Sequence, residues 1–325
     1  MNKCSRIVSL FGIIYIGRAF AYMNIKIIKT LGSGVMGTVY LAESGKTRYI
    51  YKIEKMDDVD IYNRQVDFSE VVGNQYPNSF LILKSHGVID ECDHKQPIPK
   101  WATGAFRKYL VNKNKHTKCF YLLYTPVLDC TFRDIINKVF KNNRLYLKMA
   151  YDIMSAINLM HKAGYTHNDI HGGNVMYNGK RFYLIDYGRI SHKKYKSGNI
   201  EREVKRYNLS DINMILWNLL VCNRPFMYLE DHKLPIIDYK KFMKRINAFT
   251  EYKQIYRELG YLPKPMREEP AILLTAMDYP HIYCECMGLK KVIPLEIPYP
   301  NMIRYVIKHA ADKNYDVILR YIKSL

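Results

Sequence analysis

Residues 165–188 read YTHNDIHGGNVMYNGKRFYLIDYG, and this stretch decides the fold. Two runs of strand-favouring residues, Val175-Met176-Tyr177 and 180–185, flank the dipeptide Asn178-Gly179. Asn-Gly between apolar runs is the strongest short-range signal of a β-hairpin. The sequence therefore predicts a hairpin whose turn lies at Asn178-Gly179.

Three polar side chains gather near the open end of this predicted hairpin. Asn174 directly precedes the first strand, Asp186 directly follows the second, and Asp169 lies shortly before Asn174. Amide and carboxylate oxygens such as those of Asn174 and Asp186 are suitable Mg²⁺ ligands. Asp169 can accept the proton of an attacking hydroxyl group. The pattern predicts a metal site and a general base at one end of the hairpin.

A glycine-rich segment lies between two predicted strands near the amino end. Residues 32–39 read GSGVMGTV and follow a short apolar-rich run at 24–29. Glycine has no Cβ, so its backbone amide can approach a phosphate closely. Dinucleotide-binding folds place a helix after such glycines, but strand-favouring residues 38–41 follow here. The candidate triphosphate-binding residues are Gly32, Ser33, Gly34, Val35, Met36, Gly37 and Val39.

A third predicted strand, residues 48–54, carries a candidate phosphate-binding lysine. Lys52 lies within this strand, and Lys55 is its rival. A helix predicted at 64–73 contains one glutamate, Glu70. We expect Glu70 to pair with Lys52 and to hold its ammonium group against the α and β phosphates. The alternative is that Glu70 is an exposed helix charge.

Taken together, these segments resemble the protein kinases. His167-Asn168-Asp169 with Asn174 is similar to the kinase catalytic loop H-R-D-x-x-x-x-N, and Asp186-Tyr187-Gly188 is similar to D-F-G. The resemblance covers roughly residues 24–220. It implies an α+β, two-lobed protein-kinase-like fold with a small β-rich N-lobe and a larger, mainly helical C-lobe. It also implies ATP and Mg²⁺ as cofactors and a protein serine or threonine hydroxyl as acceptor.

The resemblance assigns further residues and boundaries. The N-lobe is expected at 23–128 and the C-lobe at 129–325, after an extension at 1–22. Thr125 is the expected gatekeeper beside adenine, and Asp211 the buried aspartate that opens the central C-lobe helix. The catalytic set that the resemblance implies is Asp169, Lys52, Glu70 and His171, with Asn174 and Asp186 as the metal ligands.

Four departures from the kinase pattern matter. Asn168 replaces the arginine that receives an activation-loop phosphate, so activation by loop phosphorylation is not expected. His171 replaces the lysine that meets the γ-phosphate, a feature similar to the aminoglycoside and choline phosphotransferases. Only 24 residues separate Asp186 from Asp211, without Ala-Pro-Glu, and Tyr187 replaces phenylalanine. Divergent kinases of the casein-kinase-1-like and vaccinia-related groups, and of large DNA viruses, show comparable losses.

Three functions are therefore weighed. The first is a serine/threonine protein kinase. The second is a small-molecule phosphotransferase, which His171 and the short segment after Asp186 favour. The third is a non-catalytic pseudokinase that only binds partners, which the presence of Lys52, Asp169 and Asn174 disfavours. The sequence specifies neither the substrate nor the oligomeric state.

Charge points to the kind of partner. The formal net charge of the 325 residues is +20, which favours anionic partners such as acidic protein segments. Nucleic acid is compatible with this charge but is not required. A basic cluster follows the Asp-Tyr-Gly motif and is expected to border the acceptor; its alternative is a solvated basic loop. The cluster consists of Arg189, Lys193, Lys194 and Lys196.

Cysteine usage and the amino end bear on location. The seven cysteines are odd in number in a long chain, so we expect reduced thiols. Residues 1–22 are similar in layout to a signal peptide, but the apolar run at 7–17 is too short to span a bilayer. We favour Met23 as the natural start. The expected location is intracellular, cytoplasmic or virion-associated if the protein is viral, without a transmembrane span, and secretion is disfavoured.

Overall fold

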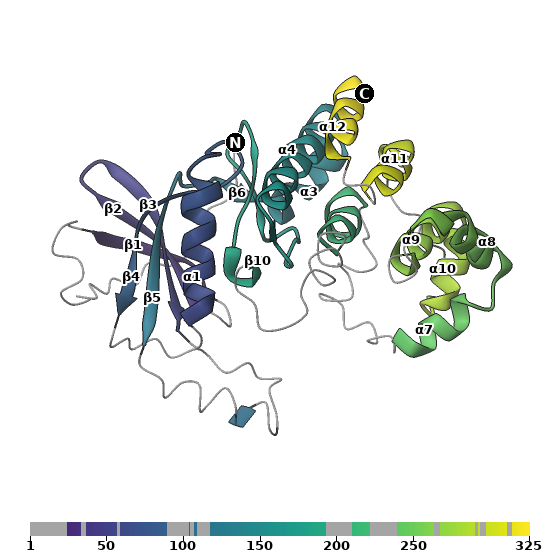
Figure 1. Ribbon diagram of the computed structural model, residues 1–325, viewed down its shortest axis with the longest axis horizontal. Coiled ribbons are helices and arrows are strands. Elements are labelled where there is room, and N and C mark those ends of the chain that lie inside the picture. Colours follow the sequence, from purple (N-terminus) through teal and green to yellow (C-terminus); the bar gives the residue numbers. More distant parts are fainter. Residues whose placement is uncertain are drawn as a thin grey trace. The chain divides into compact units, whose positions relative to one another are not determined.

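The computed structural model describes most of the chain. The described residues are 25–33, 37–56, 59–89, 104, 107, 108, 118–192, 210–221, 239–262, 267–289, 292, 297–310 and 314–325. Three sets of predictions lie outside them: the extension at 1–22, the loop residues Gly34, Val35 and Met36, and the basic residues Lys193, Lys194 and Lys196. The chain divides into two compact units, Met1–Leu128 and Asp129–Leu325. The first is built on a β-sheet and the second is mainly helical, so the predicted α+β class is confirmed (Figure 1).

The first unit contains a five-stranded antiparallel sheet in the order β1-β2-β3-β5-β4. The glycine-rich segment joins β1 to β2, as the sequence predicts, and Lys52 lies in β3. The strand bounds are Lys26–Ser33 for β1, Gly37–Ser44 for β2, Thr47–Lys55 for β3, Ile82–Ile89 for β4 and Cys119–Thr125 for β5.

The two faces of this sheet have different roles. One face carries an apolar cluster that includes Tyr51, Ile53 and Leu123. Successive side chains of a strand point to opposite faces, so Lys52 and Glu54 share the other face. Lys55 then lies on the face of Ile53. The sheet therefore separates the two rival lysines.

Helix α1 accompanies the sheet (Figure 1). Helix α1 spans Val59–Phe68, and a π-helical turn, η1, continues it over Ser69–Gly73. The ring of Tyr62 packs 5.2 Å from that of Phe120 on β5, centroid to centroid. The predicted helix at 64–73 exists, but it begins five residues earlier and changes to π geometry before Glu70.

The second unit is organised around a long helix, α4, at Asn143–Lys162. Its apolar stripe is buried, from Met149 to Met160. Asn142 caps its first turn by accepting a hydrogen bond from the amide of Leu145 at 2.9 Å. Helix α3, Phe132–Phe140, precedes it with a capping box made by Thr131 and Asp134. One short capped helix, α3, thus leads into α4.

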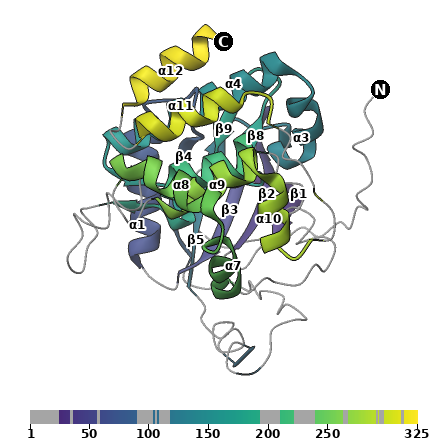
Figure 2. The ribbon, with the colours of Figure 1, turned by 90° about the vertical axis from the view of Figure 1, so that its right-hand side faces the viewer.

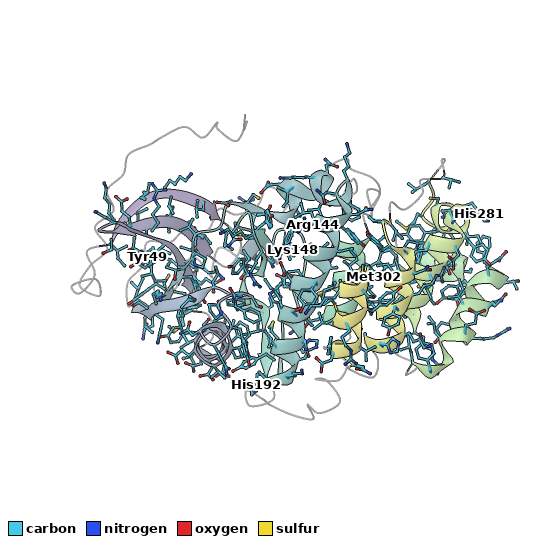
Figure 3. All side chains as sticks on the ribbon, turned by 90° about the horizontal axis from the view of Figure 1, so that it is seen from above. Tyr49, Arg144, Lys148, His192, His281 and Met302 are labelled. Atoms are coloured by element: carbon cyan, nitrogen blue, oxygen red, sulfur yellow. The ribbon has the colours of Figure 1, made fainter. Side chains whose placement is uncertain are left out.

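Helices of the carboxyl end complete this unit. Helix α12 packs on α4, and α11 packs on α12 (Figure 2). A second group, α7 to α10, is joined by contacts of α8 with α9, α9 with α10 and α7 with α10. In Figure 3, the labelled Met302 lies on α11 and His281 on α10. The bounds are Tyr239–Ile246 for α7, Thr250–Glu258 for α8, Glu268–Asp278 for α9, Pro280–Cys286 for α10, Pro300–Ala310 for α11 and Tyr315–Ser324 for α12.

The structure bears on the state of the cysteines and on membrane-spanning helices. Cys119 is disulfide-bonded, whereas Cys130, Cys284 and Cys286 are free. The prediction that all seven cysteines are reduced thiols is therefore wrong at Cys119; an odd cysteine count cannot exclude a single bridge between residues that the fold brings together. Within the described ranges, no helix is both long and apolar enough to cross a bilayer.

Candidate active site

The predicted hairpin is present in the second unit. Strands β8, Val175–Tyr177, and β9, Phe182–Leu184, pair antiparallel. Its turn is longer than predicted, because the Asn178 side chain accepts hydrogen bonds from the amides of Lys180 and Arg181 at 3.0 and 2.8 Å. The loop therefore spans 178–181, and the second strand begins at 182 instead of 180. This side-chain turn replaces the tight two-residue turn that Asn-Gly favours.

Asn174 and Asp186 both lie at the open end of the hairpin, opposite its turn. The amide of Ile185 donates to the carbonyl of Asn174 at 2.9 Å, so the two flanking segments remain paired beyond the strands. The Asn174 side chain is buried, and its Nδ2 donates to the carbonyl of Asp169 at 2.9 Å and to Asp169 Oδ2 at 3.3 Å. No described residue donates to Asn174 Oδ1. This oxygen is therefore left to accept another partner, as a metal ligand must.

Asp186 occupies a strained backbone position. Its φ of 64° lies in the left-handed region, and its exposed carboxylate accepts a hydrogen bond from the amide of Gly188 at 3.3 Å. Among the described residues, no group of three or more His, Cys, Asp and Glu side chains could hold a metal. Mg²⁺ does not need such a cage, since it commonly uses one or two protein ligands together with waters and phosphates. One amide oxygen and one carboxylate fit that requirement.

The carboxylate of Asp169 has two basic neighbours. Arg189 Nη1 lies 3.6 Å from Asp169 Oδ1, and His171 Nε2 lies 4.0 Å from Asp169 Oδ2. The amide of Gly173 donates to His171 Nδ1 at 3.0 Å. A neutral His171 ring must then carry its proton on Nε2, on the side of Asp169. The structure thus places the predicted His171 beside the predicted base.

Buried hydrogen bonds fix the backbone that carries Asp169. The amides of His167 and Asn168 donate to the two carboxylate oxygens of Asp211, both at 2.8 Å. Asp211 is fully buried, as the resemblance implies. His167 Nε2 contacts the carbonyl of Ile185 at 3.0 Å, and the amide of Asp169 donates to His167 Nδ1 at 3.3 Å. Burial lowers the pKa of His167, so the ring is neutral at pH 7 and can make both bonds.

Asn168 ties this loop to the segment after Asp-Tyr-Gly. Its φ is 62°, and its Nδ2 donates to the carbonyl of Arg189 and to Ser191 Oγ, both at 3.0 Å. Ser191 lies in β10, Ser191–His192, which pairs with β7, Tyr165–Thr166; His192 is labelled in Figure 3. A neutral amide therefore anchors the start of this segment, where a kinase of the usual pattern has an arginine.

The lysine of the first unit has a different partner from the predicted one. Lys52 Nζ lies 2.7 Å from Glu54 Oε1 on the same strand. Glu54 is 3% exposed, and its Oε2 accepts a hydrogen bond from Gln65 Nε2 on α1 at 2.6 Å. Glu70 is 53% exposed and pairs with His86 at 3.4 Å. The predicted Lys52–Glu70 ion pair is therefore wrong.

The local backbone explains this correction. Lys52 and Glu54 are two residues apart on a strand, so their side chains emerge on one face. Helix α1 presents Gln65 to that face, whereas Glu70, in the π-helical turn, is exposed and pairs with His86. Glu54 and Gln65 are functional candidates that the sequence argument missed. The sequence signal for Glu54 is an acid two residues from Lys52 in the same predicted strand, and Gln65 has no comparable signal.

The described part of the glycine-rich segment separates two kinds of glycine. A Cβ on Gly37 would lie 2.1 Å from the carbonyl oxygen of Ile53, so the β2–β3 pairing itself requires glycine there. A Cβ on Gly32 would meet nothing within 4 Å, which leaves room above the strand. Ser33 Oγ lies 3.1 Å from Thr38 Oγ1. Gly32 and Ser33 therefore remain predictions for phosphate binding, whereas Gly37 has a structural reason of its own.

Two further predicted nucleotide contacts differ in position. Val39 pairs directly with Lys52 across β2 and β3, so both side chains share a face. Thr125 is the last residue of β5, in which Leu122 is the partner of Lys52. Strand alternation places Tyr124, and not Thr125, on the face of Lys52. The structure brings Val39 to the lysine and does not bring Thr125 there.

The Glu54 pair leads to a testable contrast. We expect Glu54→Gln to lower the phosphotransfer rate about tenfold, which corresponds to about 1.4 kcal/mol, because a neutral amide orients the Lys52 ammonium less firmly. Glu70→Gln, the matched change at the exposed acid, is expected to change the rate less than about twofold. Initial rates at saturating ATP compare the two variants. A larger loss in Glu70→Gln would restore the original pairing.

Comparison with known proteins gives distant relatives. No protein-family model matches the chain. The chain is 24% identical over 171 residues to a "Probable serine/threonine-protein kinase" of fowlpox virus, covering 51% of this chain and 54% of that protein. It is 23% identical over 167 residues to the B1 kinases of variola and vaccinia viruses, covering 50% of each chain. It thus spans about half the length of these relatives.

One solved structure is similar in part. The kinase domain of PknI from Mycobacterium tuberculosis aligns with a TM-score of 0.44 and 16% sequence identity. The alignment covers 64% of this chain and 75% of that domain.

Proposed function

We propose that this chain, which has a divergent protein-kinase-like fold, transfers the γ-phosphate of ATP to serine or threonine hydroxyls of proteins. The observation that carries the proposal is the hydrogen-bonded unit of Asp169 and Asn174 before the first strand of the hairpin, with Asp186 just after the second strand. A base and two oxygen ligands of this kind are what phosphoryl transfer to a hydroxyl requires. We propose the lobes at 23–128 and 129–325.

Three residues of the second unit, Asp169, Asn174 and Asp186, have catalytic or metal-binding roles in this proposal. Asp169 accepts the proton of the acceptor hydroxyl as its oxygen attacks the γ-phosphorus and the bond from phosphorus to the ADP oxygen breaks. Asn174 Nδ2 holds Asp169 in place, and its Oδ1, with the carboxylate of Asp186, would hold Mg²⁺. When bound, Mg²⁺ neutralises charge on the phosphate oxygens.

Residues of the first unit would position the nucleotide. Lys52 would contact the α and β phosphates, held by its 2.7 Å pair with Glu54. Gly32 and Ser33, at the described end of β1, would lie under the phosphates, and Val39 would contact the nucleotide from the same face as Lys52. ATP and Mg²⁺ are the cofactors of this proposal.

One observation favours a second candidate, a small-molecule phosphotransferase. His171 Nε2 lies 4.0 Å from Asp169 Oδ2, in the position where protein kinases of the usual pattern carry lysine. A histidine there can hydrogen-bond an acceptor hydroxyl or the transferred phosphate without a permanent charge. We rank this candidate second, because the fowlpox virus relative is described as a probable serine/threonine-protein kinase.

The positive charge of Arg189 beside Asp169 suggests an acidic acceptor. Arg189 is 71% exposed and lies beside Asp169, so an acidic peptide would meet favourable potential there. We propose a protein substrate with acidic residues near the phosphorylated hydroxyl and an intracellular location, cytoplasmic, or virion-associated if the protein is viral. Nucleic acid binding is not required by the proposal.

A transfer assay separates these candidates. Labelled ATP with Mg²⁺ is supplied with serine and threonine peptides flanked by Asp or Glu, with peptides flanked by Arg, and with small alcohols and amines. We expect acidic peptides to be labelled fastest at about 0.1 M salt and the preference to fade near 1 M, because the Debye length shrinks from about 10 to about 3 Å. If only small molecules were labelled, the protein would be a small-molecule phosphotransferase, the second candidate. Equal rates on acidic and basic peptides at low salt would contradict the acidic preference.

A further inference from the structure

A chain of buried side chains connects the last helix to the loop that carries Asp169. Tyr315, the first residue of α12, places its hydroxyl 2.5 Å from His161 Nδ1 at the end of α4. His161 Nε2 lies 2.9 Å from Asp211 Oδ2. Asp211 in turn accepts the backbone amides of His167 and Asn168. The last helix is therefore three hydrogen-bonded steps from the catalytic loop.

The chemistry of the groups assigns the direction of these bonds. A carboxylate only accepts, so His161 must donate to Asp211 from Nε2. In the neutral ring Nδ1 is then an acceptor, and the Tyr315 hydroxyl is its donor. Burial raises the pKa of Tyr315, which keeps that hydroxyl protonated. Every bond in the series Tyr315, His161, Asp211 and loop amides thus has one donor and one acceptor.

We propose that Tyr315 is a positioning residue for the catalytic loop, acting through His161 and Asp211. The proposal rests on the proposed function, since it is the loop of Asp169 that is positioned. The two carboxylate oxygens of Asp211 accept hydrogen bonds from three donors, one of which is His161. The orientation of the carboxylate therefore depends on the orientation of the His161 ring. Tyr315 sets that orientation by fixing the ring from its other nitrogen. A base displaced by a fraction of an ångström loses transfer rate, since near-attack geometry is narrow.

Packing alone does not account for this arrangement. Helix α12 already buries Ile318 and Ile322, and packs on α4. The Tyr315 ring also meets the His161 ring edge-to-face, with centroids 5.6 Å apart, and a phenylalanine ring could keep that contact. The side chain of His161 is 3% exposed, so without the hydroxyl its Nδ1 would be a buried acceptor with no donor. The hydroxyl is therefore the part of Tyr315 that the packing does not explain.

The test compares two tyrosines of the same helix. Tyr315→Phe removes the relay hydroxyl, whereas Tyr321→Phe removes a hydroxyl from a ring that stacks on Tyr305 with centroids 4.0 Å apart. We expect Tyr315→Phe to lower kcat about tenfold with KM for ATP within about twofold. Tyr321→Phe is expected to leave both constants unchanged. An unchanged kcat in folded Tyr315→Phe, or an equal loss in both variants, would overturn the proposal.

A second readout does not depend on activity. We expect the amide protons of His167 and Asn168, followed by NMR, to exchange about tenfold faster in Tyr315→Phe than in the wild type or Tyr321→Phe. Unchanged exchange would overturn the relay. If the wild type transfers no phosphate, the proposed function fails while this comparison still decides on the relay.

A measurement on the wild type covers the case in which Tyr315→Phe does not fold. Nitrogen-15 shifts of labelled histidine report which ring nitrogen of His161 carries the proton. The relay requires the proton on Nε2 and an unprotonated Nδ1. A proton on Nδ1 would overturn the assignment of Tyr315 as donor.

Discussion

Replacement of Asp186 by asparagine is expected to lower phosphotransfer on the order of 10³-fold while leaving the fold intact. Asparagine tolerates the left-handed backbone that Asp186 adopts, with its φ of 64°, and can still accept the amide of Gly188. The substitution therefore removes one negative charge and keeps an acceptor for the Gly188 amide. Its large effect follows because a metal held by a single protein carboxylate loses its main charged ligand.

The control for Asp186 is the same change at an exposed aspartate of the second unit. Asp316 is 67% exposed and pairs with Lys162 at 3.5 Å. Exposed ion pairs contribute little to stability, so Asp316→Asn should retain the wild-type rate. Initial rates at several Mg²⁺ concentrations should show that Asp186→Asn needs more metal than the wild type. A rate within about tenfold of the wild type at saturating Mg²⁺ would remove Asp186 from the metal site.

The second large effect is expected at Lys52. Lys52→Arg should lower transfer about 10²-fold, because a guanidinium cannot replace a compact ammonium at a phosphate contact. The retained charge keeps a partner for Glu54, which is buried and would be costly to leave unpaired. The variant thus separates loss of positioning from loss of fold.

Lys55→Arg is the matched control for Lys52→Arg. Lys55 is buried on the opposite face of β3, so the same substitution there should not touch the phosphates. Urea midpoints of both variants should be measured alongside their rates, since arginine in a buried position strains its packing. If Lys55→Arg lost more transfer than Lys52→Arg at similar stability, the wrong lysine would have been chosen.

The second unit shows what local sequence can predict. A turn dipeptide between strand-like runs predicts a hairpin, and chain order alone then places Asn174 and Asp186 at its mouth. The details that failed depend on side-chain hydrogen bonds. The Asn178 side chain lengthened the turn by binding two amides, an alternative that composition does not distinguish from a tight turn.

The first unit shows where sequence reasoning stopped. The helix that bears Glu70 could be predicted, but its change to π geometry could not, and neither could the pairing of Glu70 with His86. Gln65 has no charge to attract notice, although it binds the acid beside Lys52. The glycine spacing predicted the strand connection, and the β2–β3 register then gave Gly37 a steric reason that the pattern did not contain.

Contacts between residues far apart in the chain could not be predicted from the sequence. Tyr315 and His161 are far apart in the chain and belong to no common motif. The disulfide at Cys119 is similar in kind, since the spacing of cysteines does not reveal which of them approach each other. The sequence shows Asn168 only as a missing arginine, and the structure adds that its side-chain amide binds the following segment directly.

The most direct test of the account is one measurement of labelled phosphate on protein. Purified wild type and Asp186→Asn are incubated side by side with γ-labelled ATP and an acidic protein, with Mg²⁺ or with excess chelator, and the labelled amino acids are identified after hydrolysis. The account predicts phosphoserine or phosphothreonine with the wild type and Mg²⁺ alone, and background with chelator or with Asp186→Asn. Equal labelling by both proteins, or none by the wild type while it binds ATP, would contradict it.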